Sequence, residues 1–220
     1  MVKKKTCIFI SGKGSNLFNL IASSRNANFP IKVSLVISNN KKAYGINYAK
    51  KYNIPYIFID TKIRNHENKV LFYLRKHKIS FICLAGFMKI IPEKLVKYYK
   101  NKIINIHPSL LPKFKGLNTF SRMLKEKEKE AGCTVHYVNN KLDSGRTIIQ
   151  KKFSINENDN EIILKTKTQT LEYKAFPEAI IKIFIKINLK KKNQFLSLHY
   201  LMSPNHVLSS CLLKFHTIFL

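Results

Sequence analysis

Short apolar runs alternate with amphipathic stretches along most of this chain, and that alternation limits the folds open to it. The first runs are rich in β-branched and aromatic residues, and they are Cys7–Ile10, Val33–Ile37, Tyr56–Ile59, Phe81–Leu84 and Ile103–Ile106. They lack the strict polar and apolar alternation of a strand with one wet face. We therefore expect strands buried on both faces, as in a parallel sheet.

The stretches between these runs carry apolar residues at helical spacing. The repeating positions are Leu17, Leu20 and Ile21 in one stretch and Val70, Leu71 and Leu74 in another. Strands that alternate with helices predict an α/β fold, with a doubly wound, mostly parallel twisted sheet and helices on both faces. Ligands of such sheets bind beyond the carboxyl ends of the strands, so the residues that follow each strand are the first candidates for chemistry.

The second half of the chain continues the pattern with less regular spacing. We expect a helix from Pro92 to Tyr99, a loop from Pro108 to Gly116, a charged helix through Lys125–Glu130, strands at Thr134–Val138 and Thr147–Phe153, and the turn Asn139 to Gly145 between them. Helical patterns return at Asn160–Leu171 and Pro177–Ile187, and Pro177 suits the first turn of the second helix.

The last helical pattern also suggests where the domain ends. Its apolar residues share one face, opposite Lys182 and Lys186. We expect one catalytic domain over residues 1–188. Residues 189–220 have no clean period and are left unassigned; a helix over Val207–Phe219 and a loosely docked or disordered extension are both open.

The net charge of +28 first suggests a nucleic-acid or membrane partner, because clustered basic residues bind phosphates. Here the lysines are spread along the whole chain beside abundant Ile and Asn, as in proteins from genomes rich in A and T codons. We expect no nucleic-acid partner and no membrane partner. A basic surface would still attract anionic small substrates.

Cysteine spacing and the N-terminal residues bear on metal binding and location. The four cysteines, Cys7, Cys83, Cys133 and Cys211, are far apart and form no zinc-ligand pattern, so we expect reduced thiols and no metal. The apolar stretch Cys7–Ile10 is too short for a secretory signal, and no uncharged segment reaches membrane-spanning length. The cytoplasm is the expected location.

A first candidate site is the loop Ser11-Gly12-Lys13-Gly14-Ser15-Asn16, which joins the first strand to the first helix. Its small residues allow backbone N–H groups and the helix N-terminus to approach a phosphate. Leu17 stands where a dinucleotide fingerprint has its third glycine, and no Gly-Lys-Ser/Thr closes the loop. The alternative is a tight turn capped by Ser15 or Asn16.

A second candidate site follows the strand that ends near Ile106. Strand alternation places Asn105 and His107 on one face at its carboxyl end. Asn can donate to a developing oxyanion and His can titrate near neutral pH, which suits acyl-type transfer through a tetrahedral intermediate. A structural histidine is the alternative.

Asp143, in Leu142-Asp143-Ser144-Gly145, is a third candidate. Its carboxylate could fold back on His107, raise the pKa of the imidazole and hold a water for proton transfer. The alternative is an Asp that only caps its turn.

Taken together and in this order, the motifs resemble those of the glycinamide ribonucleotide formyltransferases. The matching strings are the Ser-Gly-x-Gly-Ser-Asn loop, Leu84-Ala85-Gly86-Phe87-Met88, Asn105-Ile106-His107-Pro108-Ser109-Leu110-Leu111-Pro112 and Leu142-Asp143-x-Gly, and the resemblance covers roughly Lys5 to Phe184. It implies a Rossmann-like formyltransferase fold. It also implies formyl transfer from 10-formyltetrahydrofolate to the amine of 5'-phosphoribosylglycinamide in purine synthesis, by a monomer or homodimer that needs no metal.

The resemblance also implies roles for individual residues. Asn105, His107 and Asp143 would form the catalytic trio. The nucleotide would be bound by Gly14, Ser15, Asn16, Gln169, Thr170 and Glu172. The folate would be bound by Arg64, Met88, Lys89, Ile90, Ile91, Asn105, Asn139, Asn140, Lys141, Leu142 and Asp143. His136 is either a core histidine or a partner of the trio, and we favour the partner.

Other functions are alternatives to this one. A methionyl-tRNA formyltransferase should carry a further basic RNA-binding domain, for which the tail after residue 188 is too short. A formyltetrahydrofolate hydrolase should carry a regulatory domain ahead of the first strand, which here starts by Cys7. A nucleic-acid-binding module that is not an enzyme should concentrate basic and aromatic residues on one element.

Overall fold

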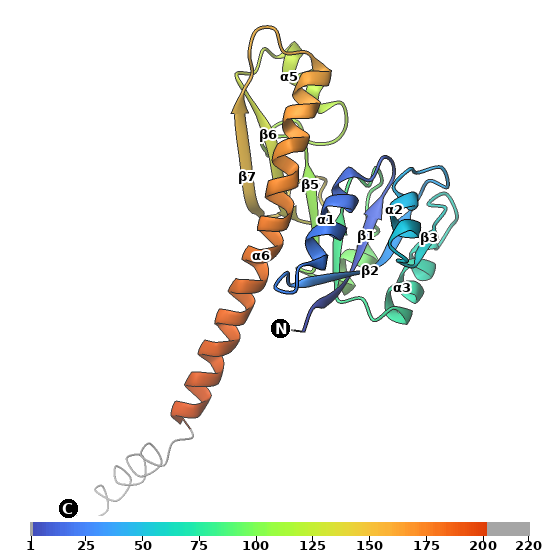
Figure 1. The fold of residues 1–220 in the computed structure, drawn as a ribbon, viewed down its shortest axis with the longest axis vertical. Coiled ribbons are helices and arrows are strands. Elements are labelled where there is room, and N and C mark those ends of the chain that lie inside the picture. The colour runs from blue at the N-terminus through green and yellow to red at the C-terminus, as the bar shows by residue number, and fades with distance from the viewer. Residues whose placement is uncertain (1, 202–220) are drawn as a thin grey trace, which may run out of the picture. The chain divides into compact units, whose positions relative to one another are not determined.

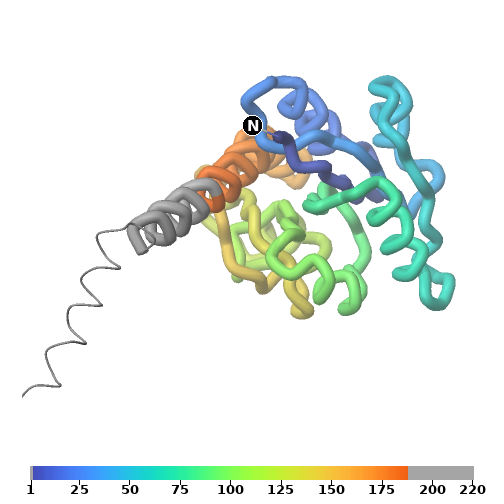
Figure 2. Tube along the Cα trace, turned by 90° about the horizontal axis from the view of Figure 1, so that it is seen from below, coloured from blue at the N-terminus to red at the C-terminus, as the bar shows by residue number. Residues whose placement is uncertain are grey.

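A computed structural model of the chain describes residues 2–201, with side chains described to residue 187. The chain divides into two compact units, Met1–Ile181 and Lys182–Leu220. Within the described residues the strands form one seven-stranded sheet in the order β3-β2-β1-β4-β5-β6-β7 (Figure 1). Figure 2 shows the same order in colour, since the trace is cyan near β3 at one edge of the sheet and yellow near β7 at the other.

The elements alternate along the chain as the apolar runs predict. They are β1 (Lys4–Ile10), α1 (Ser15–Arg25), β2 (Ile31–Ser38), α2 (Ile46–Lys51), β3 (Tyr56–Phe58), α3 (His66–Lys76), β4 (Phe81–Leu84), α4 (Glu93–Tyr98), β5 (Ile103–His107), α5 (Thr119–Lys125), β6 (Glu130–Tyr137), β7 (Thr147–Ser154) and α6 (Glu161–Leu201). Neighbouring strands from β3 to β5 are parallel, whereas β6 and β7 are antiparallel to their neighbours. The prediction of a mostly parallel α/β sheet is confirmed.

The central strands are buried on both faces, which explains their unbroken apolar runs. Cys7 and Phe9 of β1 pack in a cluster with α3 and α4 residues such as Leu74 and Leu95. The residues between and beyond them, including Ile8, are equally buried on the opposite face. Two covered faces favour continuous β-branched and aromatic runs over strict alternation.

The predicted helix through Lys125–Glu130 is wrong. The helix α5 ends at Lys125, Lys127 has a left-handed φ of 52°, and Glu130 already belongs to β6. The charged run has good helix propensity but supplies no apolar face, whereas Ala131 after it is fully buried in the sheet. Burial in the sheet outweighs local propensity.

The two predicted helices near the C-terminus are one helix, so the placement of Pro177 in a first turn is also wrong. Pro177 lies inside α6. A proline inside a helix leaves the carbonyl four residues earlier without its usual partner. That carbonyl belongs to Tyr173, and it accepts a hydrogen bond of 2.9 Å from Asn19 Nδ2 of α1 instead. The contact with α1 compensates for the missing helical bond.

Several other predictions concern single features. Cys7, Cys83 and Cys133 are buried free thiols, as expected, and Cys211 lies outside the described residues. The suggested helix over Val207–Phe219 lies outside them too. In the part of the chain that the structure describes, no helix is long and apolar enough to cross a membrane.

The end of the catalytic domain at residue 188 remains a prediction, and truncation tests it. Ala179 and Ile180 are fully buried, and Phe184 is the last buried residue among those with described side chains. A chain stopped after residue 190 should therefore fold, keep its activity and melt within about 4 °C of the parent. A chain stopped after residue 178 loses Ala179 and Ile180 and should not unfold cooperatively. Insolubility of the chain that ends after residue 190 would show that the tail completes the core.

Candidate active site

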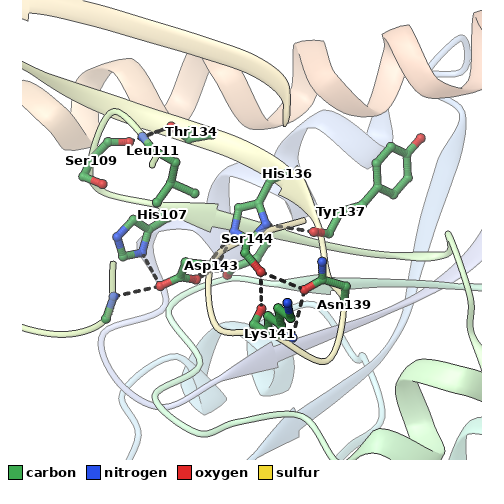
Figure 3. A network of polar contacts seen from close by, with 12 residues as sticks. His107, Ser109, Leu111, Thr134, His136, Tyr137, Asn139, Lys141, Asp143 and Ser144 are labelled. Carbon is green, nitrogen blue, oxygen red and sulfur yellow. Dashed lines mark hydrogen bonds and ion pairs between the residues drawn. The ribbon is translucent and has the colours of Figure 1, made fainter. Parts of the chain in front are cut away.

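Asn105 and His107 lie on the same side of β5, because alternate strand residues point to the same face. Ile106 between them is buried on the other face. Since β5 ends at His107, both side chains lie at the carboxyl end of the parallel sheet. Asp143, in the connection between β6 and β7, points back at His107 (Figure 3).

The carboxylate of Asp143 contacts four polar groups of this site. Its Oδ2 lies 3.3 Å from His107 Nδ1 and accepts a hydrogen bond of 2.9 Å from the Gly116 N–H. Its Oδ1 accepts from Asn105 Nδ2 at 3.4 Å and lies 3.6 Å from His136 Nε2. All four partners lie outside the 139–145 turn, so a simple turn-capping role does not describe these contacts.

The ring of His107 has acceptors on both nitrogens. Nε2 lies 2.8 Å from the carbonyl oxygen of Phe114, to which it donates, while Nδ1 faces the Asp143 carboxylate. Only the imidazolium can donate to both. Burial nevertheless lowers the pKa of His107; the Phe114 carbonyl and the Asp143 carboxylate raise it, but by less.

The net pKa of His107 therefore differs from the sequence-based expectation. Asp143 does raise it, as predicted, but the pKa ends below its ordinary value because burial is the larger effect. The ring is therefore mostly neutral at neutral pH, and the facing carboxylate favours its protonation when a second negative charge develops nearby.

The pKa of Asp143 is held below its ordinary value. Burial raises it, but the neighbouring His136 ring, the hydrogen bond from the Gly116 N–H and the nearby imidazole of His107 together lower it by more. The carboxylate is therefore ionised at neutral pH while its side chain is only 8% exposed. A charge with so little solvent exposure acts strongly on its neighbours, because the local dielectric constant is low.

His136 contacts both Asn105 and Asp143, which supports the interpretation of it as a partner of the trio. Its Nδ1–H donates to the Tyr137 carbonyl at 2.8 Å (Figure 3). That assignment leaves Nε2 as the acceptor for the Asn105 Nδ2–H at 3.2 Å. The amide of Asn105 is thus oriented with its nitrogen toward the site.

The loop after β5 is fastened to the sheet beside the trio. Thr134 Oγ1 donates to the Ser109 carbonyl at 2.6 Å and accepts from the Leu111 N–H at 3.1 Å (Figure 3). Gln150 Nε2 of β7 donates to the Leu111 carbonyl at 2.7 Å. These bonds fix the start of the segment whose later residues, Phe114 and Gly116, contact His107 and Asp143.

The loop before α1 has the open backbone that the sequence predicts. Gly14 has φ 75°, and a Cβ there would lie 2.5 Å from Gly45 Cα, so no other residue fits without a shift. No side chain caps the first turn of α1, so the alternative in which Ser15 or Asn16 caps it is wrong. The first N–H groups of α1 therefore point toward the carboxyl edge of the sheet without a side-chain acceptor.

Ser15 and Asn16 instead contact α6. Ser15 Oγ accepts a hydrogen bond of 2.7 Å from Gln169 Nε2, and Asn16 Nδ2 donates to Glu172 Oε2 at 2.8 Å. Burial raises the pKa of Glu172 from 4.5 to about 7, and the bond from Asn16 opposes that rise. The Oδ1 atom of Asn16 is buried without a hydrogen-bond partner in the described structure.

Two residues predicted to bind ligands have no described contact with the groups around Asp143 or with Ser15 and Asn16. Thr170 is exposed, and its hydroxyl donates to the Thr166 carbonyl of its own helix at 3.1 Å. Arg64 is exposed in the connection between β3 and α3. Their assignment stays a prediction.

The two segments predicted to bind folate lie side by side near Asp143. Asn140 Nδ2 donates to Glu93 Oε1 at the start of α4, at 3.1 Å. The Met88 N–H donates to Ser11 Oγ at 2.8 Å, so the loop before α1 adjoins the same region. The apolar side chains that face solvent there are Met88, Ile90 and Leu142, which are 60%, 76% and 55% exposed, while Ile91 is buried.

Comparison with known proteins identifies the family. The model of the family described as formyl transferase matches residues 4–180. The chain is 37% identical over 194 residues to a phosphoribosylglycinamide formyltransferase of Haemophilus influenzae, covering 86% of this chain and 91% of that protein. The chain belongs to the formyl transferase family.

A solved structure and a larger protein extend this comparison. The phosphoribosylglycinamide formyltransferase of Anaplasma phagocytophilum superposes with a TM-score of 0.77 at 39% identity, over 81% of this chain and 85% of that one. The trifunctional purine biosynthetic protein adenosine-3 of Chironomus tentans is 36% identical over 204 residues, which are 88% of this chain but 15% of that protein. These matches place the chain among the phosphoribosylglycinamide formyltransferases, with their Rossmann-like fold.

Sequence reasoning missed the backbone groups of this formyltransferase site. The Phe114 carbonyl and the Gly116 N–H are the closest partners of His107 and Asp143, but no side-chain motif predicts them. The prolines and the glycine of the loop indicate a fixed turn, but not which atoms face the site. Among the described residues, no group of three or more His, Cys, Asp or Glu is placed to hold a metal ion.

The raised pKa of Glu172 predicts a pH-dependent stability. Because this pKa is about 7 in the folded chain and 4.5 is the ordinary value, the folded chain holds the proton more tightly than the unfolded chain. The free energy of unfolding should therefore fall as pH rises from about 4.5 to about 7, and level off above that.

Glu172→Gln removes this effect. The melting temperature of the variant minus that of the parent should therefore rise by a few degrees between pH 5 and pH 8. Glu161→Gln, at an exposed position of the same helix, is the control. Melting curves of Glu172→Gln and parent that run parallel over this range would contradict the assignment.

Proposed function

We propose that this formyltransferase transfers the formyl group of 10-formyltetrahydrofolate to the amine of 5'-phosphoribosylglycinamide, a step of purine synthesis. The observation that carries the proposal is the contact of one buried carboxylate, Asp143, with both His107 and Asn105. The names of the relatives favour this substrate over a methionyl-tRNA formyltransferase-like or formyltetrahydrofolate hydrolase-like reaction, and over nucleic-acid binding. We expect small-molecule partners only and a cytoplasmic location.

The nucleotide phosphate fits the N-terminus of α1. The helix has eleven residues, begins after left-handed Gly14 and has no side-chain cap, so its first N–H groups can bind an anion. Asn16 Nδ2 donates to Glu172, and the Glu172 carboxylate would accept hydrogen bonds from hydroxyl or amine groups of the nucleotide. Gly14, Ser15, Asn16, Gln169 and Glu172 would then bind one molecule together.

The folate fits the surface beside Asp143. Met88, Ile90 and Leu142 expose apolar side chains there. A flat ring system that covers these side chains would remove apolar area from water. The adjoining backbone of residues 139–143 offers polar groups that would fix its orientation.

Asn105 supplies the donor for the oxyanion that forms when the neutral amine attacks the formyl carbon. Its Nδ2 contacts to His136 and Asp143, at 3.2 and 3.4 Å, are at the long end for hydrogen bonds. Such contacts hold the amide in place, and the longer one, to Asp143, can be exchanged for a stronger acceptor. Groups of this kind act mainly on the charge of the transition state.

His107 and Asp143 would stabilise the negative charge of the oxyanion and guide the proton that moves during the reaction. Nε2 of His107 is used by the Phe114 carbonyl, so only Nδ1 faces the reacting groups. A proton taken up there would be shared between the Asp143 carboxylate and the oxyanion. A water held by Asp143 would carry the proton from the attacking amine to the departing folate nitrogen, with no covalent enzyme intermediate.

His107→Ala and Asn105→Ala should lower kcat by roughly two to four orders of magnitude, with smaller changes in KM, because both side chains act on the transition state. Formyl transfer to 5'-phosphoribosylglycinamide, followed by folate absorbance, measures this. His77→Ala, at the end of α3, is the control and should behave as the parent. Near-normal kcat in either site variant would remove that residue from the mechanism.

A further inference from the structure

We propose that Arg122 of α5 is a positioning residue for formyl transfer, which holds residues Phe114–Gly116 in the conformation that orients His107 and Asp143. The kinetic part of this proposal rests on the proposed function. The structural part concerns the free protein and can be tested without substrate.

The segment from Phe114 to Gly116 gives one backbone partner to each member of the catalytic pair. The Phe114 carbonyl accepts from His107 Nε2 at 2.8 Å, which directs Nδ1 toward the carboxylate. The Gly116 N–H donates to Asp143 Oδ2 at 2.9 Å. A shift of this segment would therefore move both catalytic side chains together.

This segment adopts a backbone conformation that must be held from outside. Phe114 has φ 55° and Gly116 has φ 79°, both in the left-handed region. Glycine adopts that region freely, whereas a bulky residue such as Phe does so at a cost. Contacts with other elements have to offset the cost at Phe114.

Arg122 makes such contacts with Phe114 and Lys115. Its Nη2 donates to the Lys115 carbonyl at 2.6 Å, and its guanidinium carbon lies 5.6 Å from the centre of the Phe114 ring. The helix itself is anchored, because the neighbouring Met123 is buried in a cluster with Phe114. Arg122 therefore ties the segment to a fixed helix.

The guanidinium is held in place although one of its donors is unused. Nε of Arg122 is buried and has no hydrogen-bond partner within the described residues. A buried donor without a partner is unfavourable, and a long side chain can usually swing into water to avoid it. That Nε stays buried, although the bond to the Lys115 carbonyl is exposed to solvent, indicates that the contacts with Phe114 and Lys115 hold the guanidinium in place.

If Arg122 acted on His107 only through its positive charge, its replacement by a neutral residue would not slow catalysis. The groups that act on His107 are the Asp143 carboxylate, which raises its pKa, and His136 and Arg122, which lower it. Removal of the positive charge of Arg122 would ease protonation of His107 and would not slow a step that needs the imidazolium. A loss of turnover on neutral replacement therefore reports geometry.

The kinetic test compares Arg122→Met, Arg122→Lys and the control Lys125→Met at an exposed position of the same helix. Arg122→Met keeps a long apolar stem but no donor, so kcat should fall roughly 10- to 100-fold while both KM values stay within about threefold. Arg122→Lys keeps a donor that can reach the Lys115 carbonyl and should recover most of the loss. Lys125→Met should match the parent. Arg122→Gln, too short for the same bond, replaces Arg122→Met if that variant does not fold.

The structural test is hydrogen exchange of the Gly116 amide in the free protein, followed by NMR together with the ring nitrogens of His107. Exchange should be at least about tenfold faster in Arg122→Met than in Lys125→Met, and the His107 signals should shift, because the segment is released. Unchanged Gly116 exchange, or kcat of Arg122→Met within twofold of the parent, overturns the proposal. A parent chain that does not formylate the nucleotide would overturn the proposed function, while the exchange measurement would still decide the role of Arg122.

Discussion

The buried, ionised carboxylate of Asp143 is the interaction on which the rest of the site depends. It faces His107 at 3.3 Å, Asn105 at 3.4 Å and His136 at 3.6 Å, and it is held by the Gly116 N–H at 2.9 Å. An isolated charge at such a position would be very costly, and the Gly116 N–H and the Asn105 amide supply donors that offset the cost. The polar residues of the site are arranged around that requirement.

The fold meets this requirement by bringing distant segments to one edge of the sheet. Asn105 and His107 come from β5, His136 from the antiparallel β6, and Asp143 from the turn that follows it. The loop before α1 reaches the same region through the bond between Ser11 and Met88. The groups proposed to bind nucleotide and folate and the proposed catalytic groups therefore lie near one edge of the sheet.

The sequence was informative where side chains alone determine the structure. Periodicity predicted the parallel strands, and alternation along β5 placed Asn105 and His107 on one face. The sequence-based predictions failed where packing overrides propensity, as in the charged run before Glu130. They also failed at Pro177, which lies inside a helix because Asn19 satisfies the carbonyl that the proline leaves without a helical partner. The sequence also could not weigh burial against charge at His107, nor locate the backbone groups that orient the ring, because both depend on contacts distant in sequence.

The most direct test of this account is the pH–rate profile of Asp143→Asn, measured together with thermal unfolding. Asn keeps the shape but not the charge, so kcat should fall at least about 100-fold at every pH from 6 to 9, with a melting temperature within about 5 °C of the parent. Because Asp143 raises the pKa of His107 and the mechanism uses the imidazolium, the limb of the profile that follows loss of the His107 proton should move to lower pH. Asp60→Asn, where Asp60 accepts from the Lys62 N–H in its own turn, is the control. Activity of Asp143→Asn equal to that of the parent across this range would contradict the central role of the carboxylate.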